Sequence, residues 1–202
     1  MPSSAQRRPG GSREHVLERA ARLFAEKGYD AASVRDIAEE VAVRPSSLYH
    51  HFSSKERILF EICYTFQSDF NLSVLPELAS GRPPAEAIRG AIRAHILFAH
   101  GRWAEVVVSM RERRSLPAEL QEPIKALRRQ YRDAVAAIIA RGCEQGVFDC
   151  PDAKLAAMAV LDLVNGLSHW FRPKGRRDVD RMAMRYGDAA IALLSSWGHA
   201  ED

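Results

Sequence analysis

The chain has 202 residues, of which 47% are hydrophobic and 27% are charged. This balance provides enough apolar material for the core of one globular unit, or of two small helical ones. No apolar run approaches the roughly 18 residues of a membrane-spanning helix, which excludes a helical membrane protein. The formal net charge is only +3, so the overall charge gives little support for nucleic-acid binding, and the positions of the charges have to decide.

Residues 1–12 are rich in proline, glycine, serine and arginine. They are predicted to form a flexible basic arm. A secretory signal is excluded, because no apolar segment follows the arginines.

The cysteines are Cys63, Cys143 and Cys150, an odd number without C-x-x-C spacing. A disulfide framework or a metal site is therefore not expected, and a reducing cytoplasm is the expected location. Buried structural thiols are the expectation for all three, and redox sensing by Cys143 or Cys150 is the alternative.

The spacing of apolar residues is helical along nearly the whole chain. The first helix has apolar residues at i, i+3, i+4 and i+7 from Leu17, and it is predicted to end at Gly28. A second helix is predicted over Val34–Val41 and a short third one over Pro45–Phe52. Further helices are predicted over residues 54–72, 84–100, 103–113, 117–143, 152–170 and 178–197. The predicted fold is therefore all-α, with about nine helices.

Two capping boxes are predicted, one before and one after the short third helix. Ser33 and Asp36 match the S-x-x-D pattern, in which the serine oxygen accepts from a first-turn amide and the carboxylate reaches back. Ser53 and Glu56 repeat the pattern at the start of the following helix. Each cap contributes about 1 kcal/mol, so the two would define both ends of this region.

The segment Pro45–Phe52 has the properties of a helix that reads DNA. Leu48 and Phe52 lie four positions apart and can dock inward, while the other side chains are small or form hydrogen bonds. Arg44, at the N-terminal end, can bind O6 and N7 of guanine, a contact worth about 1–3 kcal/mol of discrimination. The pattern predicts a helix-turn-helix whose second helix enters the major groove, and an ordinary surface turn is the alternative. The predicted DNA contacts are Ser33, Arg35, Arg44, Pro45, Ser46, Ser47, Tyr49, His50 and Lys55.

Residues 13–60 resemble the N-terminal domain of TetR/AcrR-type transcriptional regulators. The resemblance is carried by Leu23, Phe24, Gly28, Tyr29, Val34–Ala38, Leu48–Phe52 and Ser54–Glu56. It implies a three-helix DNA-binding head over residues 13–58 and a ligand-binding and dimerisation body over residues 59–202. It also implies a homodimer that binds a palindromic operator in double-stranded DNA and is released by ligand. For residues 1–12, contact with DNA phosphates is the alternative to a solvated arm.

Two positions depart from the family pattern. Ala42 stands in the turn where glycine is usual, and alanine in a left-handed conformation costs roughly 1 kcal/mol. Arg44 stands where serine is common, so the third helix loses a side-chain cap and gains a residue that can contact a base. The operator sequence therefore cannot be carried over from relatives.

The last two predicted helices are expected to form the dimer interface. The segment Leu155–Leu167 is apolar nearly all round, with only Asp162 and Asn165 strongly polar, so it has to be covered on more than one side. The last helix carries an apolar stripe of Met182, Tyr186, Ala189, Ala190, Leu193 and Trp197. The two helices are expected to pack against their symmetry mates in a four-helix interface. An interior helix of a monomer is the alternative.

Large apolar residues with a few polar ones in the body predict a small-molecule site, and ordinary core packing is the alternative for each residue. The candidates are Phe66, Phe70, His95, Phe98, Trp103, Val107, Met110, Tyr131, Asn165, His169, Trp170 and Arg172. The segment His169–Gly175 resembles the W-[YF]-R-P-x-G junction of a TetR subgroup that controls lipid and sterol catabolism and responds to CoA thioesters. This implies an acyl-CoA-like effector, whose acidic headgroup the basic residues of 172–177 can bind. A solvated basic loop is the alternative.

The sequence predicts a ligand-responsive transcriptional regulator, most simply a repressor, with no cofactor and no metal. The G-x-S-x-G, H-E-x-x-H, P-loop and Rossmann glycine motifs are absent, so neither enzymatic activity nor catalytic residues are expected. A transcriptional activator and a ligand-binding protein that has lost DNA binding are the alternatives.

Overall fold

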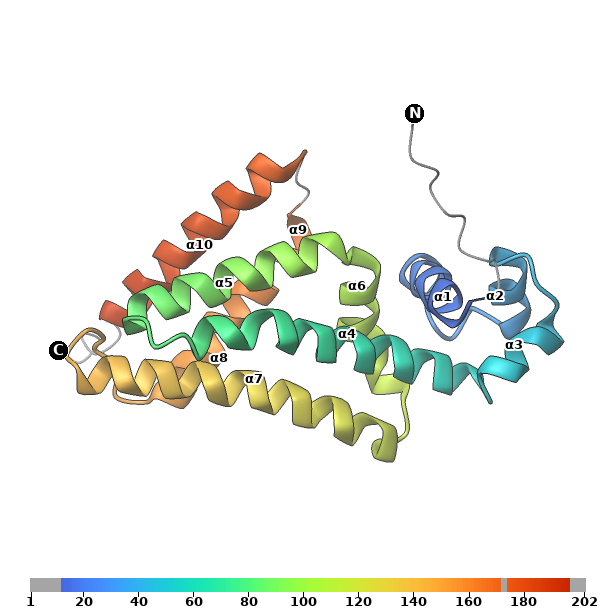
Figure 1. Cartoon of the computed structure of the whole chain (residues 1–202), viewed down its shortest axis with the longest axis horizontal. Helices are drawn as coiled ribbons and strands as arrows, with labels where there is room; N and C mark the ends of the chain where they lie inside the picture. The colour runs from blue at the N-terminus through green and yellow to red at the C-terminus, as the bar shows by residue number, and fades with distance from the viewer. Residues whose placement is uncertain (1–11, 172–173, 197–202) are drawn as a thin grey trace. The chain divides into compact units, whose positions relative to one another are not determined.

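The structure is a computed structural model that describes residues 12–171 and 174–196 (Figure 1). Within these ranges it contains ten α-helices, one 3-10 helix and no strand, which confirms the predicted all-α fold. Helices α8 and α9 are separated by one residue and correspond to a single predicted helix. None of the helices in the described ranges combines the length and hydrophobicity that a membrane crossing requires.

The described residues form two compact units. The N-terminal unit comprises the described parts of Met1–Phe66 and Ala104–Ile124. The C-terminal unit comprises those of Gln67–Trp103 and Lys125–Asp202. The chain therefore returns to the N-terminal unit after it has begun the C-terminal one.

The N-terminal unit is built from short helices around one apolar core. Its elements are α1 (Arg13–Lys27), α2 (Val34–Glu40), α3 (Pro45–His51), the start of α4 (Lys55–Leu78), α6 (Trp103–Arg111), the 3-10 helix η1 (Glu112–Ser115) and the start of α7 (Ala118–Glu144). Ser12 caps α1 by accepting a hydrogen bond from the His15 amide, and Gly28 ends α1 with a φ of 88°, as predicted. Buried apolar residues from α1, α2, α3, α4, α6 and α7 pack into one cluster.

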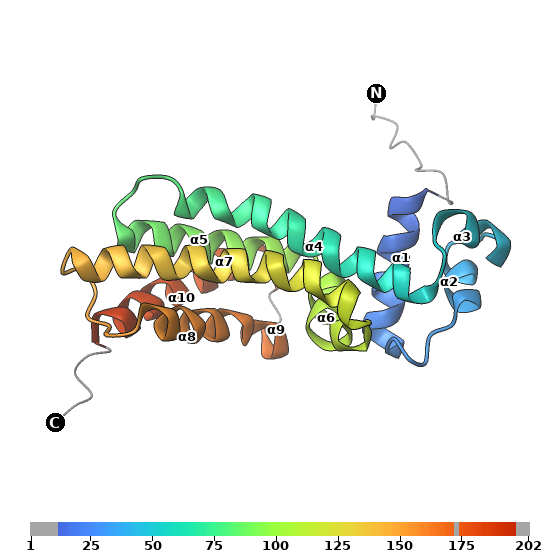
Figure 2. The ribbon, with the colours of Figure 1, turned by 90° about the horizontal axis from the view of Figure 1, so that it is seen from below.

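The C-terminal unit is a set of helices around a second apolar core. It contains the remainder of α4 and α7 with α5 (Pro84–Gly101), α8 (Ala153–Asn165), α9 (Leu167–Trp170) and α10 (Arg176–Ser196). Helix α10 packs mainly against α5 and also contacts α8 (Figures 1 and 2). Gly187 permits the close approach to α5, because a Cβ there would lie 3.3 Å from Cγ of Arg89.

Two of the predicted helices differ clearly from the observed ones. Helix α4 continues to Leu78, beyond the predicted end near residue 72, although Pro76 lies inside it. A proline has no amide hydrogen to donate to the carbonyl four positions earlier. That carbonyl belongs to Leu72, which is 74% exposed, so water can bind it instead. The helix predicted over residues 152–170 is divided at Gly166, a residue type with low helix propensity.

The cap of α4 lies one residue later than predicted. The Ser54 hydroxyl, not that of Ser53, accepts a hydrogen bond from the Arg57 amide at 3.2 Å. The Ser54 carbonyl also accepts the first helical bond, from the Ile58 amide at 3.3 Å. Ser54 is therefore the N-cap, and the predicted box of Ser53 and Glu56 is wrong by one position.

The turn between α2 and α3 is a Schellman motif built on alanine. Ala42 has a φ of 54°, and within the described ranges no other residue except glycine has a positive φ. The Val43 amide donates to the Ala38 carbonyl at 3.0 Å, and the Ala42 amide donates to the Glu39 carbonyl at 3.1 Å. The left-handed alanine that the family resemblance implies is confirmed.

Ala42→Gly should raise the free energy of unfolding by about 0.5–1 kcal/mol. Glycine removes the roughly 1–2 kcal/mol penalty of a left-handed alanine, but it also makes the unfolded chain freer. Urea unfolding followed by circular dichroism measures the difference. Ala25→Gly, inside α1, is the control and should lower stability by about 1 kcal/mol. A similar loss of stability in both variants would contradict strain at Ala42.

Candidate DNA interface and effector residues

Helix α3 has one buried face and one exposed face. Leu48 and Phe52 dock in the core of the N-terminal unit, as predicted, with 1% and 3% of their surface exposed. Tyr49 is 57% exposed. The helix begins at Pro45, and its N-cap, Arg44, makes no side-chain capping bond, which confirms the predicted loss of that cap.

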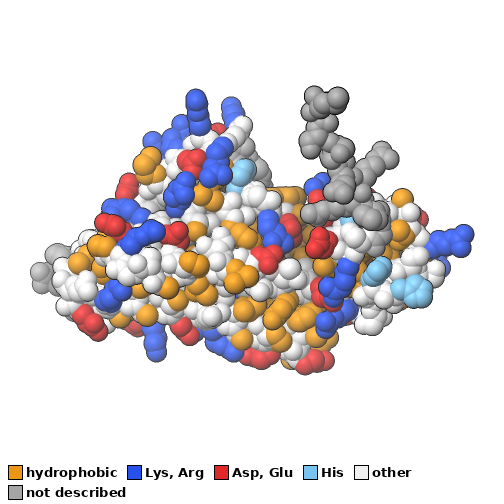
Figure 3. Space-filling model, in the orientation of Figure 1, with side chains coloured by type: hydrophobic (Ala, Val, Ile, Leu, Met, Phe, Trp, Pro, Cys, Tyr) orange, Lys and Arg blue, Asp and Glu red, His pale blue; other side chains and the backbone are white. Residues whose placement is uncertain are grey.

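The exposed face of α3 carries groups that suit nucleic acid. The exposed residues here are Arg44, Pro45, Ser46, Tyr49, His50 and His51, with Ser47 half-buried and Arg35 exposed on α2. Figure 3 shows histidine and basic side chains on the surface of this unit. Guanidinium, hydroxyl, phenol and imidazole groups can bind phosphate oxygens or base edges.

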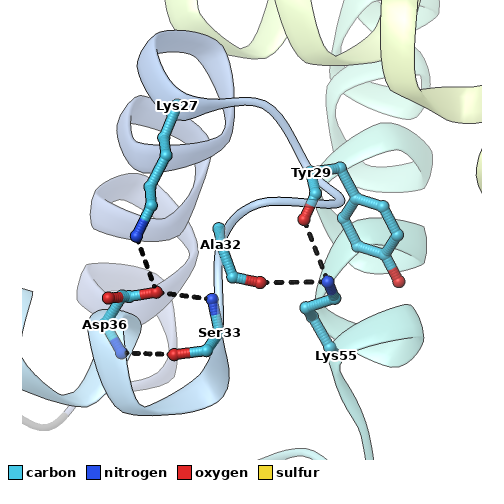
Figure 4. A network of polar contacts seen from close by, with 6 residues as sticks. All are labelled: Lys27, Tyr29, Ala32, Ser33, Asp36 and Lys55. Carbon is cyan, nitrogen blue, oxygen red and sulfur yellow. Dashed lines mark hydrogen bonds and ion pairs between the residues drawn. The ribbon is translucent and has the colours of Figure 1, made fainter.

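The start of α2 is held by a capping box and an ion pair (Figure 4). The Asp36 amide donates to the Ser33 hydroxyl at 3.1 Å, and the Ser33 amide donates to Asp36 Oδ2 at 2.6 Å, which confirms the predicted box. Lys27 Nζ lies 3.0 Å from the same carboxylate oxygen. The hydrogen bonds from Ser33 and the contact with Lys27 lower the pKa of Asp36 to about 2. The main role of Ser33 is therefore to cap the N-terminus of α2.

Lys55 ties the start of α4 to the loop that precedes α2. Its Nζ donates to the carbonyls of Tyr29 at 2.9 Å and Ala32 at 3.0 Å, and it lies 4.2 Å from the centroid of the Tyr29 ring (Figure 4). Two carbonyls and an aromatic face are suitable partners for a half-buried ammonium. The ammonium thus faces protein carbonyls, whereas the sequence predicts a contact with DNA. Its position supports a structural role.

Two arginines bind the buried Glu61 beside α3. Arg13 Nη2 lies 2.5 Å from Glu61 Oε2, and Arg57 Nε donates to Glu61 Oε1 at 2.9 Å. The Arg13 guanidinium also lies 5.4 Å from the centroid of the Phe52 ring, at the C-cap of α3. This cluster is not predicted from the sequence. The i, i+4 spacing of Arg57 and Glu61 is a local signal for the contact between these two residues. No local pattern indicates the contact between Arg13 and Glu61.

Four of the candidate effector residues pack together in the C-terminal unit. They are Phe70, His95, Phe98 and Tyr131. The Phe70 ring is central, with centroid distances of 4.7, 5.0 and 5.7 Å to the rings of His95, Tyr131 and Phe98. We call this set the aromatic cluster; it joins α4, α5 and α7.

The polar groups of the aromatic cluster are buried and uncharged near pH 7. Burial, with a smaller effect of Arg128, lowers the pKa of His95 to about 4. The Tyr131 hydroxyl lies 3.4 Å from His95 Nδ1, and burial raises the pKa of this phenol. The pair can offer hydrogen bonds to a ligand but no charge.

The other candidate effector residues lie elsewhere. Phe66, Val107 and Met110 belong to the N-terminal unit. In the C-terminal unit Trp103, His169 and Trp170 are exposed and Asn165 is half-buried. Arg172 lies outside the described residues, as do Trp197 and all but the last residue of the predicted basic arm.

Two family models match the chain. "Bacterial regulatory proteins, tetR family" matches residues 16–62, and "Tetracyclin repressor-like, C-terminal domain" matches residues 81–194, which is more than half of the chain. The chain belongs to the TetR family of transcriptional regulators. It is therefore a DNA-binding regulator and not an enzyme, and α2, the turn at Ala42 and α3 form its helix-turn-helix.

TetR-family relatives match over nearly the whole chain. The HTH-type transcriptional repressor KstR2 of Rhodococcus jostii (strain RHA1) is 30% identical over 188 residues, 92% of each chain. The crystal structure of the regulator PfmR from Thermus thermophilus aligns with a TM-score of 0.81 and 37% identity over 88% of this chain and 97% of PfmR. AibR, solved in complex with isovaleryl coenzyme A and operator DNA, aligns with a TM-score of 0.79 and 28% identity over 90% of this chain and 97% of AibR.

Lys55→Met should lower the free energy of unfolding by about 2 kcal/mol, because two carbonyls lose a charged donor. Amide hydrogen exchange in α2 and α3 should accelerate, since the loop before α2 loses its tie to α4. Lys27→Met, which removes an ion pair between the exposed Lys27 and the half-buried Asp36, is the control and should cost less than about 1 kcal/mol. Equal losses in the two variants would contradict the structural role of Lys55.

Proposed function

We propose that the protein is a homodimeric repressor that reads its operator with α3 and is released by an acyl-CoA-like effector. The observation that carries the DNA-reading role is the two-faced α3, in which Leu48 and Phe52 are buried while Arg44 and Tyr49 are exposed. A helix docked in this way can enter the major groove, about 12 Å wide, without disturbing its own core. Membership of the TetR family supports this role.

Arg44 and Tyr49 are the proposed specificity residues. Arg44 precedes the first turn of α3, the end that helix-turn-helix proteins bring to the base edges, and its guanidinium can bind O6 and N7 of guanine. Tyr49 can contact a phosphate or a thymine methyl group. Further contacts are proposed for Arg35, Pro45, Ser46, Ser47 and His50. Lys55 is proposed as a positioning residue, because its ammonium binds protein carbonyls.

The dimer is proposed to form through α8 and α10. Leu155 and Met158 on α8 are each 51% exposed, and Met184 on α10 is 65% exposed. The row that faces the core of the unit from α10 is Val179, Ala183, Gly187, Ala190 and Leu194. Of the stripe predicted from the sequence, Ala190 belongs to this buried row, whereas Met182, Tyr186 and Leu193 are half-buried and Ala189 is exposed. Exposed apolar side chains on two contacting helices would be covered by an isologous interface.

The effector is proposed to combine an apolar acyl group with an anionic headgroup. Trp170 is 57% exposed, and the basic residues Lys174, Arg176 and Arg177 follow it on the surface. An aromatic face can stack on a base, and these cations can bind phosphates, so together they suit the nucleotide part of coenzyme A. The neutral pair of His95 and Tyr131 supplies no charge, which is why the anionic part is assigned to these basic residues. The complex of AibR with isovaleryl coenzyme A supports this class of effector.

Arg44→Ala and Tyr49→Ala should each weaken specific operator binding by at least about tenfold, because each removes a contact from both half-sites of a dimer. The probe is a duplex selected from random DNA by the wild-type protein, and fluorescence anisotropy at constant salt gives the Kd. Arg22→Ala and Tyr64→Ala remove exposed side chains of the same types elsewhere in the N-terminal unit and should bind normally. Normal binding by both α3 variants would refute the assignment.

Isovaleryl-CoA and longer acyl-CoA thioesters should dissociate the operator complex, while free coenzyme A and the free acids should act only at far higher concentrations. Free coenzyme A lacks the acyl group, and the free acids lack the coenzyme A headgroup. Arg177→Ala should raise the thioester concentration needed for half-release several-fold, and Arg185→Ala, further along α10, is the control. Competition with the anisotropy probe measures both effects. Equal potency of free acids and thioesters would contradict a headgroup site.

A further inference from the structure

Two of the three cysteines lie in contact where α7 ends and the chain turns toward α8. Cys143 lies in the last turn of α7 and is half-buried, and Cys150 lies in the following loop and is buried. Both are free thiols, and their Sγ atoms are 3.3 Å apart. This contact plays no part in the DNA-reading surface or in the proposed effector site.

The loop between the two cysteines is folded so that it returns to α7. The amides of Val147 and Phe148 both donate to the Gly142 carbonyl, at 2.8 and 3.2 Å. The Phe148 ring packs directly over Gly142, where a Cβ would lie 2.1 Å from the ring. Gly146 turns the chain with a φ of 69°. The short distance between the thiols therefore follows from a defined backbone turn.

Cys150 is also held by α10. The Asp149 amide donates to the Leu194 carbonyl at 2.9 Å, and the Cys150 thiol lies 3.7 Å from the same oxygen. On the other side, the Cys143 thiol donates to the Cys150 carbonyl at 3.4 Å. The two sulfur atoms are thus positioned from α7 and from α10, so neither has to be recruited by a large movement.

We propose that Cys143 and Cys150 form a redox modification site, at which hydrogen peroxide or an organic hydroperoxide produces an intramolecular disulfide. The Cys143 thiolate attacks the peroxide, the O–O bond breaks, and Cys143 sulfenic acid and water or an alcohol are formed. The Cys150 sulfur then attacks the sulfenic sulfur. The S–O bond breaks and the hydroxide leaves with the Cys150 proton as water. Two thiols lose two electrons and two protons, and the peroxide is reduced.

The order of the two steps follows from the surroundings of the thiols. Cys143 is the more exposed of the two and meets the peroxide first. Burial, with the hydrogen bond to Cys143, raises the pKa of Cys150 to about 12, so Cys150 keeps its proton and can donate it toward the Cys143 sulfur. Cys63 is 0% exposed in the core of the N-terminal unit and serves as an internal control.

The test is peptide mapping of the full-length protein after mild treatment with hydrogen peroxide and alkylation of the remaining thiols. The expected product is a disulfide between Cys143 and Cys150, with Cys63 alkylated, and dithiothreitol should restore both thiols. In Cys150→Ser, sulfenic acid should accumulate on Cys143 and be trapped by dimedone, whereas Cys143→Ser should give neither product. Cys63→Ser should behave like the wild type.

Several products would overturn the proposal. Three of them are oxidation of Cys63 before the pair, a disulfide between two chains, and sulfinic acid on Cys143 with Cys150 recovered as an unoxidised, alkylated thiol. The absence of any reaction at Cys143 and Cys150 would overturn it as well. The wild-type peptide map distinguishes all of them by itself, so the result does not depend on whether a variant folds.

Discussion

The docking of α3 through Leu48 and Phe52 is the contact on which the DNA-reading surface depends. A seven-residue helix is not stable alone, because nucleation costs more than its few hydrogen bonds return. Two buried side chains on one face therefore determine both that the helix forms and where its opposite face points. The left-handed Ala42 precedes the helix and the Arg13 guanidinium packs over Phe52 at its end, so both ends are held.

Polar residues near α3 serve two different purposes, and the sequence alone does not separate them. Arg44 and Lys55 both look like DNA contacts in a basic, hydrogen-bonding segment. In the structure Arg44 is exposed, whereas Lys55 binds the carbonyls of Tyr29 and Ala32, which lie 26 and 23 residues earlier. Contacts between residues so far apart in the sequence depend on how α4 packs against the loop that precedes α2, and no local pattern encodes that packing.

Features that depend on local patterns were predictable, and features that depend on long-range packing were not. The capping box at Ser33 follows from residue types and spacing, and the left-handed Ala42 is implied by the family resemblance, in which glycine is usual at this position. The cap of α4 was misplaced because Ser53 and Ser54 are adjacent serines and the pattern alone does not select between them. In the C-terminal unit, helical periodicity identified large apolar residues but not which ones meet. The contact between Cys143 and Cys150 likewise requires the turn that brings the loop back to α7.

Methylation interference on the selected operator duplex tests the central claim most directly. Dimethyl sulfate modifies guanine N7 in the major groove and adenine N3 in the minor groove, so one experiment distinguishes the two grooves. The account predicts that methylated guanines block binding at two symmetric positions one helical turn apart, about 34–36 Å. It also predicts that Arg44→Ala loses sensitivity to one guanine in each half-site. Interference confined to adenine N3, or to a single half-site, would contradict a dimer that reads the major groove with α3.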